Sequence, residues 1–128
     1  EDKATTLAHE AEERYGIHCS GLKLTRRNLG KVEKAILLVN ATSLGMHPKV
    51  EESPIPKELI PEEIMVFDVV YNPLKTRFLK EAEERGAKTI SGIDMLIGQG
   101  AASFKLWTGR DAPEELMRRT VLKALGAV

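Results

Sequence analysis

Two short, continuous apolar runs stand out in the pattern of hydrophobic and polar residues along the chain. They are Ala35–Val39 and Ile64–Val70, and the second is interrupted only by Asp68. Runs of this length and composition are typical of strands that are buried on both faces of a parallel sheet. A third short strand is expected at Lys88–Ser91, and another within Ile17–Leu24.

Between these strands, the spacing of apolar residues and the positions of capping residues predict helices. The predicted helices cover residues 2–15, 25–33, 72–85, 93–107 and 113–125, and the proline-rich loop 47–63 holds one helical turn at 57–60. Asn72 is expected to cap the helix over 72–85, with Pro73 at its first position. Strands that alternate with helices predict an α/β fold with a parallel sheet.

Composition and charge narrow the possible functions. The chain has 128 residues, 19 of them acidic and 19 basic, so it lacks the basic surface of a nucleic-acid-binding protein. It contains no apolar run long enough for a membrane span and no leader pattern, so no membrane partner is expected. Cys19 is the only cysteine, which favours a reducing, cytoplasmic location. The three histidines lack the spacing of metal ligands, so no metal site is expected.

Candidate chemistry begins where the first apolar run ends, at Asn40–Met46. In open α/β sheets, ligands bind beyond the carboxyl ends of the strands. Thr42 and Ser43 follow that strand end, where their hydroxyls could bind a ligand or satisfy backbone groups of a turn. Val69 and Tyr71 lie at the end of the second run and could equally be packing residues.

Gln99 lies within the apolar sector of the helix predicted over 93–107. A buried amide without a partner costs about 1–3 kcal/mol, so Gln99 is expected to bond to the backbone, a water or a ligand. Asp68 is a carboxylate inside an apolar run; we expect it to accept backbone N–H groups near the following helix start rather than to act in catalysis.

A glycine-rich phosphate loop is absent from the sequence. In a doubly wound nucleotide-binding domain that loop follows the first strand. Since the chain opens at Glu1 in a helix pattern, we expect a fold truncated at the N-terminus, with the first strand and its loop upstream of Glu1.

Four segments, in an order and spacing that cover roughly residues 35–110, carry a resemblance to a known family. They are Asn40–Met46, Phe67–Pro73 with Thr76 and Phe78-Leu79, Gly86-Ala87, and Gly92–Gly100 running on to Phe104 and Trp107. In these segments the chain resembles shikimate dehydrogenase, in the later part of its NADP-binding domain. The resemblance implies a partial Rossmann-like, doubly wound parallel sheet flanked by helices. It further implies that residues 1–109 are the remainder of the NADP-binding domain and that 110–128 form a C-terminal helix.

The resemblance also implies a reaction, the NADPH-dependent reduction of 3-dehydroshikimate to shikimate in the chorismate pathway of aromatic amino acid biosynthesis. The family's catalytic lysine and aspartate belong to an N-terminal substrate domain, so no catalytic residue is expected in these 128 residues. The fragment alone is expected to be inactive, and the missing N-terminal part of the same enzyme is its expected partner.

Individual contacts are implied by the same resemblance. The implied NADP contacts are Lys3, Thr42, Ser43, Val69 and Gly92, with Lys3 near the adenosine 2′-phosphate. The implied contacts to the substrate are Tyr71 and Gln99. Two alternatives stay open: a quinate/shikimate dehydrogenase that uses NAD, and a non-catalytic interaction module built from half a nucleotide-binding domain. Such a half domain would expose a sheet edge and could self-associate through it.

Overall fold

The computed structural model of the chain describes residues 2–127. The chain has two compact units, with the boundary between Glu33 and Lys34. Among the described residues, no helix combines the length and the apolar character that crossing a membrane requires.

The first unit begins with α1 (Asp2–Tyr15), which confirms the helix predicted over 2–15. Gly16 follows the helix with φ 63°, the left-handed conformation that ends helices at a glycine. Thr25 then caps α2 (Arg26–Leu29), where its Oγ1 accepts a hydrogen bond from a backbone N–H. The 3-10 helix η1 (Gly30–Lys34) continues it, so the helix predicted over 25–33 is confirmed in two short pieces.

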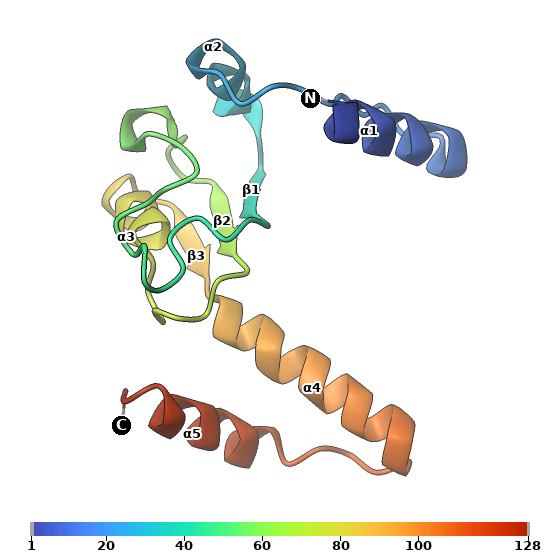
Figure 1. Cartoon of the computed structure of the whole chain (residues 1–128), viewed down its shortest axis with the longest axis vertical. Helices are drawn as coiled ribbons and strands as arrows, with labels where there is room; N and C mark the ends of the chain where they lie inside the picture. Colours follow the sequence, from blue (N-terminus) through green and yellow to red (C-terminus); the bar gives the residue numbers. More distant parts are fainter. Residues whose placement is uncertain (1, 128) are drawn as a thin grey trace. The chain divides into compact units, whose positions relative to one another are not determined.

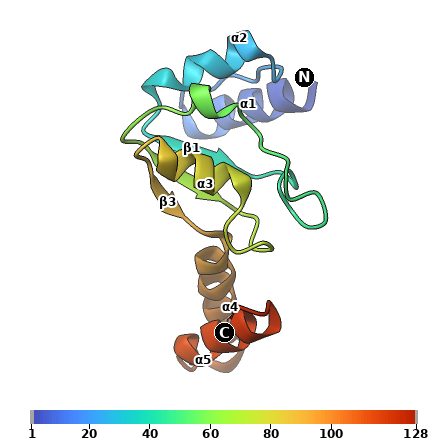
Figure 2. The same cartoon turned by 90° about the vertical axis from the view of Figure 1, so that its left-hand side faces the viewer.

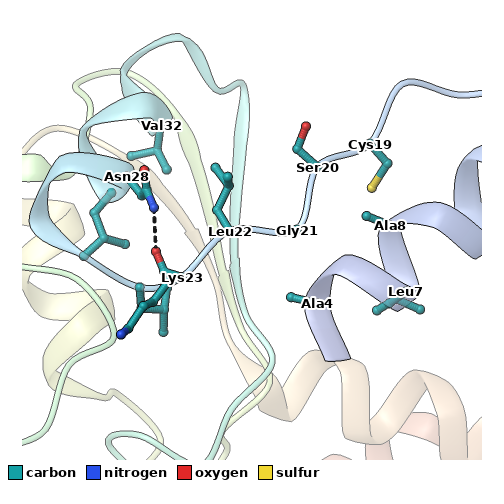
Figure 3. Close-up of a pocket in the computed structure, with 12 residues that line it drawn as sticks. Ala4, Leu7, Ala8, Cys19, Ser20, Gly21, Leu22, Lys23, Asn28 and Val32 are labelled. Carbon is teal, nitrogen blue, oxygen red and sulfur yellow. Dashed lines mark hydrogen bonds between the residues drawn. The ribbon is translucent and has the colours of Figure 1, made fainter. Parts of the chain in front are cut away.

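The strand predicted within 17–24 is wrong, because this segment has no regular secondary structure. It runs against α1 instead of pairing with a strand. A Cβ at Gly21 would lie only 2.3 Å from the backbone carbonyl group of Ala4, so this approach requires glycine. The backbone N–H of Cys19 donates to Oε1 of Glu12 on α1, at 2.9 Å. An apolar cavity of about 390 Å³ lies between α1 and the segment (Figure 3).

The second unit is built on a three-stranded parallel sheet in the order β1-β2-β3. Its strands are β1 (Leu37–Asn40), β2 (Met65–Asp68) and β3 (Lys88–Ile90). Asn40 is in register with Asp68, so the carboxyl ends of β1 and β2 lie beside each other. The predicted parallel α/β fold is therefore confirmed, with the strands slightly shorter than the apolar runs (Figure 1).

One face of this sheet is packed against α3 (Arg77–Glu84), as Figure 2 shows. The core between them contains Val66, Phe78 and Ala82, each at most 1% exposed. Leu37 and Met65, which alternate with the inward residues, remain 48% and 42% exposed. The prediction that both apolar runs are buried on both faces is thus wrong, because within this unit α3 packs on one face only.

Two helices follow the sheet. α4 (Gly92–Thr108) starts directly after β3, where Ser91 caps it through a hydrogen bond from the Ile93 N–H to the Ser91 Oγ at 3.4 Å. α5 (Glu114–Ala124) folds back along α4, and Arg118 on α5 forms an ion pair with Asp94 on α4 at 2.8 Å. Both predicted helices are confirmed to within one or two residues. The predicted turn in the loop 47–63 is also present, as η2 (Lys57–Leu59).

Candidate functional site

A cavity of about 350 Å³ opens at the carboxyl ends of β1 and β2. One wall is the loop after β1 and the other is the segment that leaves β2. The lining residues are Thr42, Ser43, Met46, His47, Val69, Val70, Tyr71 and Asn72. This is the position at which open α/β sheets bind ligands.

The first wall is held by the side chain of Asn40, which is 2% exposed. Its Nδ2 donates to the carbonyl oxygen of Leu44 at 3.2 Å and to Oδ1 of Asp68 at 3.0 Å. Its Oδ1 accepts from the backbone N–H of Thr42 at 3.1 Å and from the Thr42 hydroxyl at 2.7 Å. Asn40 therefore uses both of its amide hydrogens and accepts two hydrogen bonds, which fixes the course of the loop.

The second wall is held by Asp68, which is fully buried. Besides the bond from Asn40, its Oδ1 accepts from the backbone N–H of Val70 at 3.0 Å, and its Oδ2 accepts from the Thr76 hydroxyl at 2.6 Å. The expectation that Asp68 accepts a backbone N–H group is confirmed by the bond from Val70. Its carboxylate ties the exit of β2 to the exit of β1 and to the start of α3.

Thr76 begins α3, because its Oγ1 accepts a hydrogen bond from the backbone N–H of Leu79 at 3.3 Å. The predicted start at Asn72 and Pro73 is therefore wrong by four residues, although the end near Arg85 is correct. The helix begins at Thr76 because its buried hydroxyl both caps the helix and donates to Asp68, which an N-cap at Asn72 with Pro73 at the first position would not provide. Residues 72–75 are consequently loop, and Asn72 is free to line the cavity.

Four of the residues predicted from the sequence come together in this cavity: Thr42, Ser43, Val69 and Tyr71. The Thr42 hydroxyl already bonds within the loop, donating to Asn40 and accepting from the N–H of Leu44 at 3.2 Å. Ser43 is exposed, and Tyr71 is 41% exposed. Neither of these two hydroxyls has a hydrogen-bond partner among residues 2–127.

Gly92 lies directly behind the second wall and is buried. A Cβ at this position would lie 2.5 Å from the carbonyl oxygens of both Val69 and Val70. Real Cβ atoms essentially never come this close to a backbone oxygen, so only glycine allows α4 to start against the exit of β2. The groups that Gly92 approaches belong to the chain itself, and the NADP contact that the resemblance implies for Gly92 stays a prediction.

Gln99 does not line the cavity, and its side chain is exposed on α4 rather than buried. The prediction that Gln99 is buried is therefore wrong, and its amide does not need a partner within the chain. The helical projection placed it beside apolar residues, but α4 is covered on only part of that sector, where Ile93, Ile97 and Ala101 are buried. Lys3 is exposed on α1 in the first unit, and its contact with a ligand stays a prediction.

Asn40 and Thr76 hold the site, and Met46 and His47 line it, although none of the four is singled out by the sequence as a site residue. Their signal was present, since all four lie in or beside the segments that carry the family resemblance. Among the described residues, no cluster of three or more His, Cys, Asp or Glu side chains could hold a metal ion.

Comparison with known proteins identifies similar chains. Residues 92–122 match the family model described as the shikimate 5'-dehydrogenase C-terminal domain. The shikimate dehydrogenase (NADP(+)) of Methanosarcina acetivorans is 52% identical over 88% of this chain and 38% of its own length.

Two solved structures are similar across almost the whole chain. A shikimate dehydrogenase in complex with NADP+ matches 97% of this chain and 44% of its own length, with a TM-score of 0.85 and 36% identity. The shikimate 5-dehydrogenase of Thermus thermophilus, in complex with NADP(H) and shikimate, matches 95% of this chain and 44% of its own length, with a TM-score of 0.78 and 38% identity. The chain thus spans less than half the length of these relatives.

Proposed function

Because this chain belongs to the shikimate dehydrogenase family, whose C-terminal part it matches, we propose that it forms the later part of an NADP-binding domain. The complete enzyme reduces 3-dehydroshikimate to shikimate in aromatic amino acid biosynthesis. The observation that carries this proposal is the single cavity that gathers Thr42, Ser43, Val69 and Tyr71 at the carboxyl ends of β1 and β2.

The lining of the cavity suits the nicotinamide half of the cofactor. Val69 and Met46 offer apolar surface to a flat, neutral ring, and Thr42 and Ser43 offer oxygen atoms to its polar substituents. When bound, NADPH supplies the hydride. The task of this chain is to hold the ring against the β2 exit, and Gly92 lets α4 begin directly against the backbone of that exit.

Substrate contacts are proposed for two further side chains. Tyr71 lines the cavity with a hydroxyl that has no partner among the described residues, so it is available to a hydroxylated ring. Gln99 is likewise exposed and without a partner in residues 2–127, which leaves its amide available to a substrate hydroxyl. Hydrogen bonds of this kind give strong discrimination between hydroxylated substrates and their analogues.

The remaining components of the enzyme are proposed to come from an N-terminal part. That part would supply the catalytic lysine and aspartate, together with the loop that binds the diphosphate. Its first strand would pair with β1, since β1 pairs with β2 alone among the described strands and leaves one edge open. Without that partner, the open edge would favour self-association. Residues 1–109 then complete the cofactor domain, and residues 110–128 contribute its closing helix, α5 (Glu114–Ala124). Lys3 binds the 2′-phosphate, and the enzyme works in the cytoplasm.

Titration and reconstitution test the proposal. The 128-residue chain alone is expected to bind NADPH weakly and to reduce nothing, because most phosphate contacts lie elsewhere. The enzyme completed with its N-terminal part is expected to consume NADPH only when 3-dehydroshikimate is added. Sub-micromolar binding of NADPH by the chain alone would contradict this division of the site. A completed enzyme that prefers NADH and quinate would favour the NAD-dependent alternative instead.

A further inference from the structure

The orientation of the Asn40 amide is determined by partners whose hydrogen-bonding polarity cannot change. The carbonyl oxygen of Leu44 only accepts, so the atom that faces it must be Nδ2, and the same atom lies 3.0 Å from Oδ1 of Asp68. The backbone N–H of Thr42 only donates, so the atom that faces it must be Oδ1. These two backbone partners agree, and together they assign the oxygen and the nitrogen of the amide.

This orientation decides what the Thr42 hydroxyl can do. Its oxygen lies 2.7 Å from Oδ1 of Asn40, which carries no hydrogen, so the Thr42 hydroxyl must donate its single proton to Asn40. The same oxygen accepts the N–H of Leu44 at 3.2 Å. One lone pair then remains, and Thr42 can therefore accept a hydrogen bond from a ligand but cannot donate one.

The buried network behind Asn40 holds this arrangement in place. Asp68, which bonds Asn40, is fully buried and is itself held by the Val70 N–H and by the hydroxyl of Thr76. Asp68 accepts all three of these hydrogen bonds. The Asn40 amide is therefore held with its Nδ2 toward Asp68 and its Oδ1 toward Thr42. Ser43 next to Thr42 provides the contrast, since its exposed hydroxyl has no partner among the described residues and can donate or accept.

We propose that Asn40 is a positioning residue that presents Thr42 to the cavity as a hydrogen-bond acceptor only. The ligand group bound at Thr42 is therefore a donor, an amide N–H or a hydroxyl, and a carboxylate or phosphate oxygen is rejected there. This inference rests on the proposed function for the identity of the ligand, and it names the polarity of one contact in that site.

The experiment measures the dissociation constant of NADPH for the completed enzyme and its variants. Thr42→Val removes the hydroxyl at nearly constant shape. It removes the bond to the ligand together with the bonds to Asn40 and Leu44, and it is expected to weaken NADPH binding by at least about 3- to 10-fold. Thr42→Ser keeps the hydroxyl and is expected to stay within about twofold of the wild type. Thr108→Val, which makes the same change at the far end of α4, serves as the control and is expected to leave binding unchanged.

A cofactor analogue distinguishes the two kinds of donor. In the 3-acetylpyridine analogue of NADPH, a methyl ketone replaces the carboxamide, which removes its N–H donors and keeps its carbonyl. If the donor is the amide, Thr42→Val has no effect on binding of the analogue. If the donor is a hydroxyl, Thr42→Val weakens both cofactors equally and Thr42→Ser restores both. The first outcome supports an amide donor at Thr42. The second supports a hydroxyl donor when the Thr42 hydroxyl proton is also in slow exchange and bonded to Asn40, because a Thr42 that donated to the ligand would have to leave Asn40.

Asn40 is tested through its coupling to Thr42. Because Asn40 and Thr42 are in direct contact, their effects on binding are expected to couple, and the penalty of Thr42→Val should shrink in an Asn40→Ala background. An equal penalty in both backgrounds would contradict the positioning role of Asn40. If Asn40→Ala does not fold, proton exchange in the wild-type chain answers the question by NMR. A Thr42 hydroxyl proton in slow exchange and close to the Asn40 side chain supports the inference.

Three results would overturn the inference: Thr42→Val binding NADPH as tightly as the wild type, Thr42→Ser failing as Thr42→Val does, or a Thr42 hydroxyl proton in free exchange. Failure of the proposed function looks different. In that case the wild-type completed enzyme itself does not bind NADPH, and no comparison between variants can be made.

Discussion

Replacing Thr76 by valine is expected to destabilise the second unit far more than its small change in shape would indicate. The hydroxyl of Thr76 donates to the buried Asp68 carboxylate at 2.6 Å and also caps α3. A hydrogen bond to a charged group contributes about 1.5–3 kcal/mol, and the loss of an N-cap costs about 1 kcal/mol. Allowing for incomplete additivity, the expected loss is about 3 kcal/mol, which lowers the Tm of a domain of this size by about 12–24 °C.

Thr76→Ser is the matched control, because it keeps the hydroxyl and loses one buried methyl group, which costs about 1 kcal/mol. Urea unfolding of the 128-residue chain and both variants gives the free energies of unfolding, and thermal melts give the Tm values. The valine variant should be the less stable by about 2 kcal/mol. A valine variant as stable as the serine variant would show that the Asp68–Thr76 bond does not hold the start of α3, and the account of the cavity walls would fail with it.

Three further predictions concern single positions. Gly92→Ala should strongly destabilise the chain, because a Cβ there meets two carbonyl oxygens at 2.5 Å. Gly98→Ala in the same helix is the control: its Cβ would meet open space, and the free energy of unfolding should rise by up to about 1 kcal/mol. Equal Tm values for the two variants would refute the close approach at Gly92. Gln99→Ala should change the stability by less than about 0.5 kcal/mol and raise the KM for shikimate in the completed enzyme; a large fall in Tm with unchanged kinetics would give the residue a structural role. The pKa of Glu12 lies below its ordinary value of 4.5, first because its carboxylate accepts the Cys19 N–H. The stabilisation from this contact is therefore present above the unfolded-state pKa and is lost as the pH falls through the lower, folded-state pKa. An NMR titration that placed the Glu12 pKa at or above 4.5 would refute this prediction.

Local signals were sufficient for the sheet and for most helices. The runs that became β1 and β2 were recognised from their length and composition, because four or five consecutive apolar residues flanked by polar ones are too few for a typical helix and suit a strand. The ends of α4 were equally predictable, since Ser91 caps one end and Gly109 ends the other with φ 71°.

The errors arose where a partner distant in the sequence decided the structure. The segment 17–24 contains a β-forming pattern, but a strand requires a neighbouring strand, and here the segment lies against α1 instead. The start of α3 depended on Asp68, eight residues upstream of Thr76, and no local rule weighs a buried carboxylate against an Asn-Pro pair. The exposure of Gln99 depended on how much of α4 is covered by other elements.

The sequence by itself therefore determined the alternation of strands and helices, the family resemblance and the residues around the strand ends, because these depend on periodicity and on short motifs. Only the tertiary structure decided that Thr42 and Tyr71 share one cavity, that Gln99 lies outside it, and that the Thr42 hydroxyl donates its hydrogen bond to Asn40. The physical reason is that the direction of a hydrogen bond depends on every partner around it. Asp68 is 28 residues away from Asn40 in the chain, and the two side chains meet only when β1 pairs with β2.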